Sequence, residues 1–411
     1  MEKIYGLIGN PLGHSFSPQI HAGIGDYIYK LFPMEENEVG NFLTEKKFEA
    51  INVTIPYKQT VMPFCDRIAP EALSIGSVNT IVKEADGSLS GYNTDYFGFS
   101  AMLKRSGIEP ANRKCIVLGS GGSSKTACCV LRDMGASSVT VISRSGENNY
   151  ENLYLHKDAE IIVNTTPVGM YPKNGASPID LDDFPACIGV ADLIYNPEKT
   201  ALLLQAEAKN IAHAGGLYML VAQGVRASEF FFNTKYEDAV IEKVYREVNS
   251  KMRNIVLVGM PGCGKSSVGK ALAALLDRPF VDCDEYVTET EGRTPAEIIT
   301  ESGVERFREI ESAALAELSK RSGIILATGG GAVTIPKNHA YLRQNGPVFF
   351  IDRDISLLDT AGRPLSAGGG DRLKAMYAQR LPMYEKVCDY VIKTDASSEI
   401  EKTAKKIADS F

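Results

Sequence analysis

Residues 254–267 read Asn-Ile-Val-Leu-Val-Gly-Met-Pro-Gly-Cys-Gly-Lys-Ser-Ser, an apolar run of strand length that breaks into a glycine loop and then opens a helix. Gly259, Gly264, Lys265 and Ser266 fit the P-loop pattern G-x-x-x-x-G-K-[ST]. In such a loop backbone N–H groups face phosphate oxygens, the lysine reaches the β- and γ-phosphates, and the hydroxyl holds Mg²⁺. About 250 residues precede the motif, enough for another domain or two. The sequence therefore predicts a nucleotide-binding part joined to a separate N-terminal part.

The composition is that of ordinary globular domains. The chain has 411 residues, of which 44% are hydrophobic and 23% charged, so two or three domains can each bury a core. A net charge of −7 without a basic face argues against nucleic acid as a partner. Strand-length apolar runs and an N-terminus that enters a strand directly predict a cytosolic protein without a membrane span or signal peptide. The eight cysteines lack metal-binding spacing, so reduced, mostly buried thiols are expected.

Polar clusters follow several predicted strands in the first hundred residues. A short strand at 3–8 ends in a turn that contains Ser15 and Ser17, and a helix is predicted from residue 19 onward. These two hydroxyls could merely cap that helix. Three further clusters, at 52–58, 77–80 and 91–95, also stand at strand ends, where ligand sites collect in open α/β sheets.

A βαβ unit is predicted from residue 114 onward. A strand at 114–118 leads into a glycine loop at 119–124, a helix to residue 134 and a second strand at 138–142. The loop is G-x-G-G-x-S, which alone is weak evidence and leaves a bare turn as the alternative. At the end of the second strand, where an NAD site has an acidic residue, Arg144 stands between two serines, which suits a 2′-phosphate. The cofactor is therefore predicted to be NADP, with a solvated surface arginine as the alternative.

Across nearly all of residues 1–248 the chain resembles the shikimate dehydrogenase family. The matching motifs, in order, are G-N-P-L-G-H-S-F-S-P at 9–18, N-V-T-I-P-Y-K at 52–58, S-V-N-T at 77–80, G-Y-N-T-D at 91–95, G-S-G-G-S at 119–123, N-T-T-P-V-G-M at 164–170, Y-N-P-E-K-T at 195–200 and G-G-L-Y-M-L-V-A-Q at 215–223. Two departures stand out: Ala22 and Ser143 each replace an asparagine usual in the family. Neither change removes a charged or catalytic group.

The resemblance assigns roles to residues of the N-terminal part. Lys58 and Asp95 would be the catalytic pair, because hydride arriving at a ring ketone leaves charge on oxygen and an ammonium held by a carboxylate can supply a proton. Which of the two delivers the proton stays open, and a surface salt bridge is the alternative. The shikimate pocket would contain Ser15, Ser17, Thr54, Asn79, Tyr195 and Gln223. NADP would be bound by Gly119, Ser120, Gly121, Gly122, Ser123, Ser143, Arg144, Ser145, Leu193 and Gly216.

The C-terminal part has its own series of motifs. A strand at 279–284 ends in Asp282 and Asp284, and strand alternation predicts both carboxylates on one face, one near Mg²⁺ and one near an acceptor hydroxyl. The remaining elements are F-R at 307–308, a strand ending in T-G-G-G at 328–331, a strand at 348–352, R-P-L at 363–365, R-L-P-M-Y at 380–384 and a strand at 390–393.

This second series resembles shikimate kinase over essentially all of residues 252–411. Shikimate would be held by Asp284, Arg308, Gly330 and Arg380, with the arginines pairing its carboxylate. ATP would be bound by Gly262, Cys263, Gly264, Lys265, Ser266, Ser267 and Arg363. Lys265 and Arg363 would stabilise the transferring phosphoryl group, Ser266 would ligate Mg²⁺ with support from Asp282, and Asp284 would orient or deprotonate the attacking hydroxyl.

Three further features of this part carry expectations. Glu311 would orient an arginine, with an ordinary helix-surface glutamate as the alternative. Val304 replaces a glutamate usual in the family, and the lid around 359–363 lacks an arginine that can stack on adenine, which predicts altered nucleotide affinity. The glycines at 368–370 predict a lid that closes on ATP.

Together these patterns predict an α/β protein in four parts. They are a substrate domain at 1–100 and 218–248, a Rossmann NADP domain at 101–217, a linker at 249–251, and an NMP-kinase-like P-loop domain with five parallel strands at 252–411. The resemblances imply NADPH-dependent reduction of 3-dehydroshikimate to shikimate, then Mg-ATP-dependent phosphorylation of shikimate at its 3-hydroxyl.

Two alternatives remain open. One is a quinate-type dehydrogenase fused to another small-molecule kinase, and the other keeps one half as a non-catalytic binding module. The expected partners are small molecules only, with neither nucleic acid nor membrane, and the sequence predicts no oligomeric state.

Overall fold

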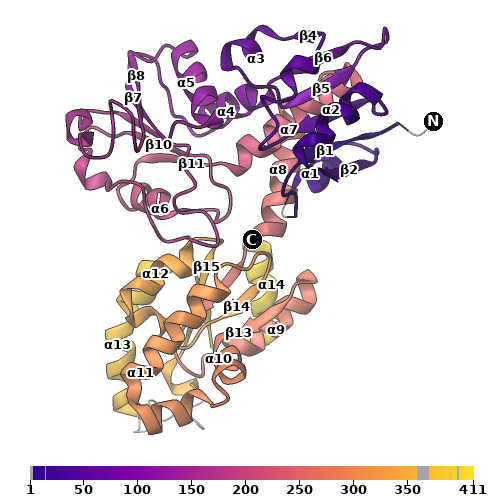
Figure 1. Cartoon of the computed structure of the whole chain (residues 1–411). Coiled ribbons are helices and arrows are strands. Elements are labelled where there is room, and N and C mark those ends of the chain that lie inside the picture. The colour runs from indigo at the N-terminus through magenta and orange to yellow at the C-terminus, as the bar shows by residue number, and fades with distance from the viewer. Residues whose placement is uncertain (1–2, 14, 359–369, 396–397) are drawn as a thin grey trace. The chain divides into compact units, whose positions relative to one another are not determined.

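The computed structural model describes residues 3–13, 15–358, 370–395 and 398–411 (Figure 1). The chain divides into two compact units. The first unit consists of Met1–Met170, Ala176–Tyr195 and Leu202–Asn249. The second unit consists of Tyr171–Gly175, Asn196–Ala201 and Ser250–Phe411. Both are α/β, and the described strands form three sheets, two in the first unit and one in the second, which confirms the predicted fold class.

The first sheet of the first unit is mixed, with the strand order β2-β1-β3-β5-β6-β4. Its strands are β1 Tyr5–Gly9, β2 Tyr29–Pro33, β3 Ala50–Val53, β4 Arg67–Ile68, β5 Thr80–Lys83 and β6 Leu89–Tyr92. The helices around it are α1 Ser17–Ile24, α2 Glu36–Glu45, α3 Pro70–Ile75, α4 Thr94–Arg105, α7 Leu217–Phe232 and α8 Asp238–Met252, with a 3₁₀ turn at Met62–Phe64. Strands β1 and β3 are parallel, and β6 runs the same way because two antiparallel steps separate it from β3. The loops after β1, β3 and β6 therefore leave one edge of the sheet together.

The second sheet of this unit is entirely parallel, with the order β11-β10-β9-β7-β8. Its strands are β7 Lys114–Leu118, β8 Ser138–Ile142, β9 Ile161–Asn164, β10 Gly189–Asp192 and β11 Ala212–Gly215. The connecting helices are α5 Gly122–Asp133 and α6 Ala201–Ala208, with 3₁₀ turns at Leu153–His156 and Leu181–Asp183. Strands β7 and β8 have the bounds that their apolar runs predicted, and β7-α5-β8 is the predicted βαβ unit.

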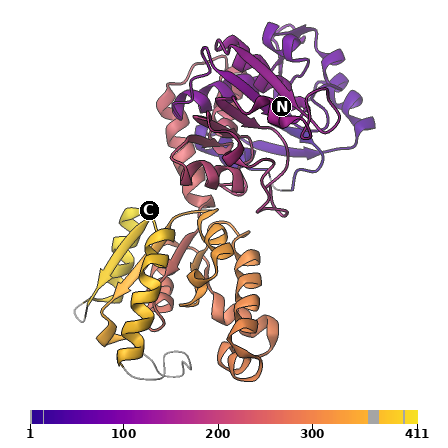
Figure 2. The ribbon, with the colours of Figure 1, turned by 90° about the vertical axis from the view of Figure 1, so that its left-hand side faces the viewer.

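The second unit contains one parallel sheet, with the order β13-β14-β12-β15-β16. Its strands are β12 Ile255–Val258, β13 Phe280–Asp282, β14 Ile325–Ala327, β15 Val348–Arg353 and β16 Tyr390–Thr394. Its helices are α9 Lys265–Leu276, α10 Cys283–Glu291, α11 Pro295–Leu318, α12 Pro336–Arg343, α13 Gly370–Val387 and α14 Ile400–Ser410, with 3₁₀ turns at Ala332–Thr334 and Ile355–Leu357. Helices α9 and α14 lie on one side of this sheet and α11, α12 and α13 on the other (Figures 1 and 2).

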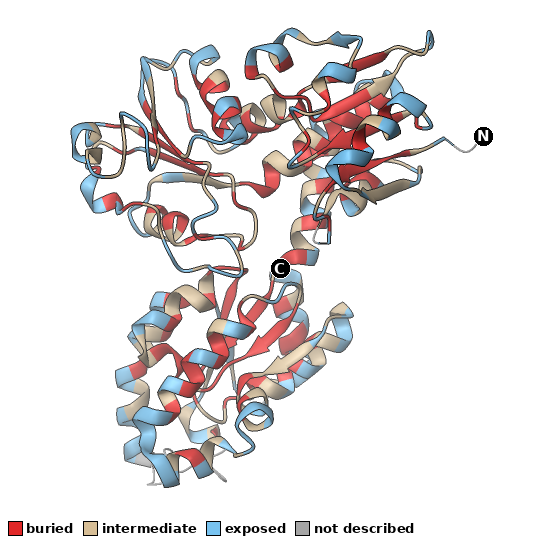
Figure 3. Cartoon of the chain, in the orientation of Figure 1, coloured by how far each residue is buried: buried red, intermediate tan, exposed pale blue. Residues whose placement is uncertain are grey.

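Burial follows this layering. Strands β12, β14 and most of β15 are buried, because helices cover both faces of the sheet, and their residues are almost all apolar (Figure 3). All eight cysteines are free, and five of them are buried, as expected. No helix in the described part of the chain is long and apolar enough to span a membrane.

Three helix boundaries differ from those that the sequence predicted. Helix α1 begins at Ser17, two residues earlier than expected. The apolar spacing of Val240, Val244 and Val248 predicts one helix over 228–248, but the structure has two, because Asn233 takes a left-handed conformation (φ 46°) that ends α7. Residues 249–251 form the last turn of α8, so the segment predicted as a linker is helical.

Candidate functional sites

The Lys58–Asp95 pair lies at the common edge of the first sheet. Lys58 is in the turn after β3, and Asp95 is in the first turn of α4, which begins directly after β6. The Lys58 ammonium donates a hydrogen bond to Asp95 Oδ2 over 2.6 Å. Their side chains are 24% and 18% exposed, so the pair is more enclosed than a solvated surface salt bridge, yet it can still be reached from solvent. An ammonium fixed by a carboxylate at an accessible edge can donate a proton to a bound carbonyl.

Asn79 and Gln223 are joined through Thr94, the first residue of α4. The buried Asn79 Oδ1 accepts hydrogen bonds from the Thr94 backbone N–H at 2.7 Å and from the Thr94 hydroxyl at 3.2 Å. The same hydroxyl contacts Gln223 Oε1 at 3.2 Å, and Gln223 reaches it from α7. The network thus fixes two predicted pocket residues near the start of the helix that carries Asp95.

The other predicted pocket residues lie in the loops after β1, β3 and β10, except Ser17, which is the first residue of α1. Ser15 Oγ accepts a hydrogen bond from the Ser17 backbone N–H at 3.3 Å, a local turn that agrees with the simple capping alternative as well. The Tyr195 ring meets Phe16 edge to face with centroids 6.0 Å apart, and burial raises the pKa of Tyr195. Thr54 follows β3, and a Cβ on Gly9 would lie 2.4 Å from its methyl group. Glycine at position 9 therefore makes room for Thr54.

The predicted NADP residues surround the start of α5. Gly121 caps this helix without a side-chain hydrogen bond, and a Cβ on Gly121 or Gly122 would have nothing within 4 Å. The first N–H groups of α5 therefore face open space, as an anion-binding helix start requires. Gly119 has a φ of +103°, which favours glycine. Arg144 is exposed just after β8, the parallel neighbour of β7, and so stands at the same sheet edge. This arrangement fits a dinucleotide with a 2′-phosphate.

Gly216 and Leu193 are in direct contact. A Cβ on the buried Gly216 would lie 2.1 Å from the Leu193 carbonyl oxygen. Leu193 follows β10, and Gly216 follows the neighbouring parallel strand β11. Only glycine allows these two loops to approach so closely at the carboxyl edge of the second sheet.

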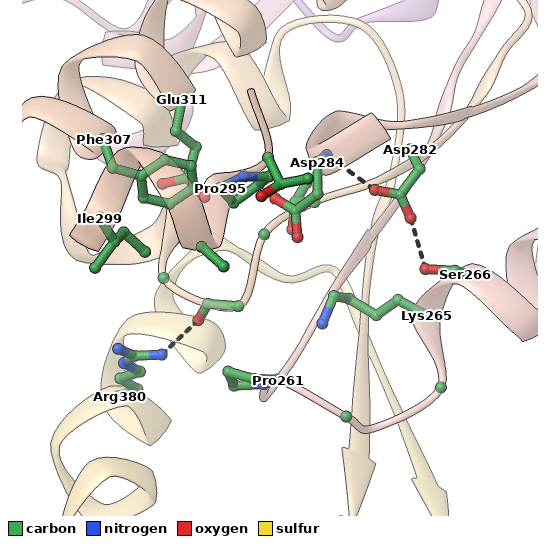
Figure 4. Close-up of a pocket in the computed structure, with 18 of the residues that line it drawn as sticks. Pro261, Lys265, Ser266, Asp282, Asp284, Pro295, Ile299, Phe307, Glu311 and Arg380 are labelled. Atoms are coloured by element: carbon green, nitrogen blue, oxygen red, sulfur yellow. Dashed lines mark hydrogen bonds between the residues drawn. The ribbon is translucent and has the colours of Figure 1, made fainter. Parts of the chain in front are cut away.

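In the P-loop of the second unit, the motif's lysine, Lys265, is hydrogen-bonded to the backbone of the loop itself. Lys265 Nζ donates hydrogen bonds to the carbonyl oxygens of Gly259 and Met260 at 2.9 and 3.0 Å. Ser266 Oγ donates to Asp282 Oδ2 at 2.6 Å (Figure 4). Gly264 caps α9 without a side-chain hydrogen bond, which leaves the first N–H groups of this helix available for phosphate. The loop borders a cavity of about 590 Å³.

The two acids after β13 do not alternate on a strand, so that prediction is wrong. Strand β13 ends at Asp282, and Asp284 belongs to the first turn of α10. Asp282 caps this helix, because its Oδ1 accepts a hydrogen bond from the Asp284 backbone N–H at 2.9 Å (Figure 4). Both carboxylates nevertheless line the cavity, where Asp282 meets the P-loop serine and Asp284 lies farther from it. The helix cap separates the two acids as the predicted roles require.

Arg308 and Glu311 form a buried ion pair on α11. Arg308 Nη1 and Glu311 Oε2 are 2.5 Å apart, and their side chains are 11% and 0% exposed. The alternative of a helix-surface glutamate is therefore wrong. Burial raises the pKa of the Glu311 carboxyl, and the Arg308 guanidinium opposes that rise. A Cβ on Gly329 would lie 2.1 Å from Glu311 Oε1, and one on Gly331 would lie 1.9 Å from Arg308 Nη2. The glycine run after β14 thus leaves the space that this pair fills.

Arg380 approaches the same cavity from α13. Its Nη1 donates to the Gly330 carbonyl oxygen at 3.0 Å, and the Tyr384 hydroxyl donates to the same oxygen at 2.5 Å. Burial lowers the pKa of this guanidinium. The cavity therefore combines a phosphate-binding loop with the Asp284 carboxylate and with the guanidinium groups of Arg308 and Arg380. Such a set can hold an anionic hydroxy compound beside a nucleotide.

Arg363 lies outside the described residues. Arg353, the last residue of β15, lines the P-loop cavity but was missed from the sequence. Its signal was a single cation directly after a predicted strand, at the edge where parallel strands place ligand sites.

Within the described part of the chain, no group of three or more His, Cys, Asp or Glu side chains could hold a metal ion. A cation at Ser266 and Asp282 would thus need water and phosphate ligands, as Mg²⁺ commonly has.

The fold and both sites define the class. The first unit is built as an NADP-dependent oxidoreductase and the second as a P-loop phosphotransferase. The chain belongs to the shikimate dehydrogenase family, and it also carries a shikimate kinase domain. Residues 7–81 match the model of the shikimate dehydrogenase substrate binding domain, and residues 261–411 match the shikimate kinase model. Both predicted resemblances are confirmed.

Similar proteins agree for the N-terminal part. The shikimate dehydrogenase (NADP(+)) of Clostridium beijerinckii is 36% identical over 263 residues, which are 59% of this chain and 97% of that protein. A chorismate mutase/shikimate 5-dehydrogenase fusion protein from Clostridium acetobutylicum has a TM-score of 0.58 at 36% identity and covers 61% of this chain and 98% of its own. The shikimate 5-dehydrogenase of Thermus thermophilus in complex with NADP(H) and shikimate has a TM-score of 0.55 at 30% identity, covering 60% and 99%.

Proposed function

We propose that this chain catalyses two consecutive steps on one metabolite. Its first unit reduces 3-dehydroshikimate to shikimate with NADPH, and its second unit phosphorylates shikimate at the 3-hydroxyl with Mg-ATP. The observation that carries the proposal is the cavity of about 590 Å³ in which Lys265 and Ser266 lie with Asp284, Arg308 and Arg380. A phosphate cradle beside a carboxylate and two guanidinium groups fits a hydroxy acid as phosphoryl acceptor.

In the reductase site the side chains of the protein stabilise the charge that forms on the substrate oxygen and supply its proton. NADPH, when bound at the start of α5 and beside Arg144, supplies a hydride. The ketone oxygen then gains negative charge, and the Lys58–Asp95 pair stabilises it and provides the proton. Asn79 and Gln223, fixed through Thr94, bind ring hydroxyls and so set the orientation of the substrate.

In the kinase site, Arg308 and Arg380 bind the acceptor carboxylate. Asp284 orients the attacking hydroxyl or accepts its proton. Lys265 exchanges its two backbone carbonyl partners for phosphate oxygens and stabilises the transferring group. Ser266 and Asp282 would hold Mg²⁺, which neutralises phosphate charge there.

A coupled assay tests the proposal. Full-length protein receives 3-dehydroshikimate, NADPH and Mg-ATP, and shikimate 3-phosphate is quantified by mass spectrometry. Lys58→Ala should abolish reduction and spare phosphorylation of added shikimate, and Lys265→Ala should do the reverse. Loss of both activities in either folded variant would contradict independent sites. Quinate, offered in place of shikimate, should be the poorer substrate of both units; a preference for it would replace the proposed substrate.

A further inference from the structure

Arg353 stands between the P-loop and a second hollow of the kinase unit. It ends β15, which pairs with the P-loop strand β12 through Val258 and Phe350. A Cβ on Gly264 would lie 3.8 Å from Arg353 Nη1, so the guanidinium faces the residue that caps α9 across a gap of about one side-chain carbon. That helix start is where nucleotide phosphates bind.

Within the described ranges no acidic side chain pairs with Arg353. Among the described residues none forms an ion pair with Arg353 or accepts a hydrogen bond from it, and its buried Nε has no partner. The acids on either side are engaged elsewhere. Asp352 Oδ1 accepts from the Tyr377 hydroxyl at 2.9 Å, and Asp354 Oδ1 accepts from the backbone N–H and hydroxyl of Ser356 at 2.9 and 2.7 Å. A partly buried guanidinium in this state favours an anion as its partner.

The second hollow, between the ends of β15 and β16, offers space for the part of a nucleotide that lies outside the P-loop cavity. It measures about 620 Å³ and lies between the ends of β15 and β16, with Ile355, Tyr377 and Thr394 in its wall. Of the described residues, Arg353 alone lines both this hollow and the P-loop cavity. The acceptor groups Arg308 and Arg380 belong only to the P-loop cavity. A nucleotide with its phosphates in the P-loop can therefore place its ribose and base in the second hollow, and its phosphate chain then passes Arg353.

We propose that Arg353 is a nucleotide-binding residue that grips the phosphate chain of ATP where it passes from the P-loop cavity to the hollow between β15 and β16. The inference rests on the proposed use of ATP by this unit. The contact is a charge-assisted hydrogen bond between the guanidinium and phosphate oxygens, so it does not depend on the base.

Titration of nucleotide into the full-length protein tests the role of Arg353. Binding is measured by calorimetry, because the chain contains no tryptophan whose fluorescence could report it. ATP and inorganic tripolyphosphate are titrated with Mg²⁺ and without shikimate. Arg353→Ala should weaken both by about 10- to 100-fold, and Arg353→Lys should recover part of the loss. Arg306→Ala is the matched control, because Arg306 is an exposed arginine of the same unit that pairs with Glu309; it should bind like the wild type.

Two results would overturn the assignment. One is ATP affinity of Arg353→Ala within twofold of the wild type. The other is a loss for ATP but not for tripolyphosphate, which would place the contact on the base. Unchanged shikimate KM, reductase rate and circular dichroism melting in Arg353→Ala separate a ligand contact from a folding defect. Because these titrations need no turnover, a wild type that binds ATP but fails to phosphorylate shikimate would refute the proposed function and not this inference.

Discussion

Replacing Glu311 with alanine should damage the kinase site through Arg308. Glu311 is fully buried and Arg308 is 11% exposed, so solvent screens their 2.5 Å contact little. Removing one partner of a buried ion pair costs about 3–5 kcal/mol, because the other charge stays buried without compensation. If Arg308 then loses its orientation, the lost charge-assisted contact with the acceptor carboxylate is worth ~1.5–3 kcal/mol, or about 10- to 150-fold in kcat/KM for shikimate.

The assay compares Glu311→Ala with a control on the same helix. Glu309 forms an exposed ion pair with Arg306, at 66% and 57% exposure, so Glu309→Ala should change stability by only ~0–1 kcal/mol. Steady-state kinetics give kcat/KM for shikimate and for ATP, and urea unfolding of the kinase unit is followed by hydrogen exchange. Only the shikimate value should fall strongly in Glu311→Ala. If this variant matched Glu309→Ala in both stability and kcat/KM, the positioning role would be refuted.

Three other predictions concern the reductase unit. Arg144→Ala should raise KM for NADPH about tenfold while leaving NADH turnover unchanged, as measured by the ratio of kcat/KM for the two cofactors. Gly216→Ala should destabilise the unit by ~1–3 kcal/mol, because the new Cβ would lie 2.1 Å from the Leu193 carbonyl oxygen; thermal inactivation of reductase activity checks this. Burial lowers the pKa of His21 to about 3, so between pH 6.5 and 3 only the unfolded chain takes up its proton, and stability falls as pH drops. When the pH falls from 7 to 5, the free energy of unfolding should therefore decrease by ~2 kcal/mol less in His21→Gln than in the wild type. Hydrogen exchange measures this free energy in both proteins.

Local patterns predicted much of the fold. The runs at 114–118 and 138–142 gave strands with the observed bounds. Strand β7 is buried from Cys115 to Leu118, as expected for an inner strand of a parallel sheet, whereas the edge strand β8 is buried only at Ile142. The P-loop gave both its strand and its helix. By contrast, the end of α7 at Asn233 depends on one left-handed residue, a choice that apolar spacing does not reveal.

The sequence predicted the candidate sites less well where the direction of a side chain decides its role. Asp284 was expected on a strand, but Asp282 caps α10 and turns the chain into a helix first. Burial of Glu311 depends on the glycines after β14, which lie far away along the chain. The sequence shows Arg353 as a cation directly after a predicted strand, but only the folded chain brings it close to Gly264. The failed predictions, Asp284 on a strand and one helix at 228–248, depended on local backbone direction, whereas the burial of Glu311 and the place of Arg353 depend on contacts between distant segments.

The two carbonyl contacts of Lys265 bear on how tightly ATP can be held. The ammonium already uses two of its three N–H donors on Gly259 and Met260, so a triphosphate that takes more than the third must replace one of these bonds. The net gain is then the difference between two sets of hydrogen bonds, which is smaller than the full worth of a lysine–phosphate contact. The buried ammonium therefore has backbone partners of its own, which lowers the free energy that a phosphate contact at Lys265 can add to binding.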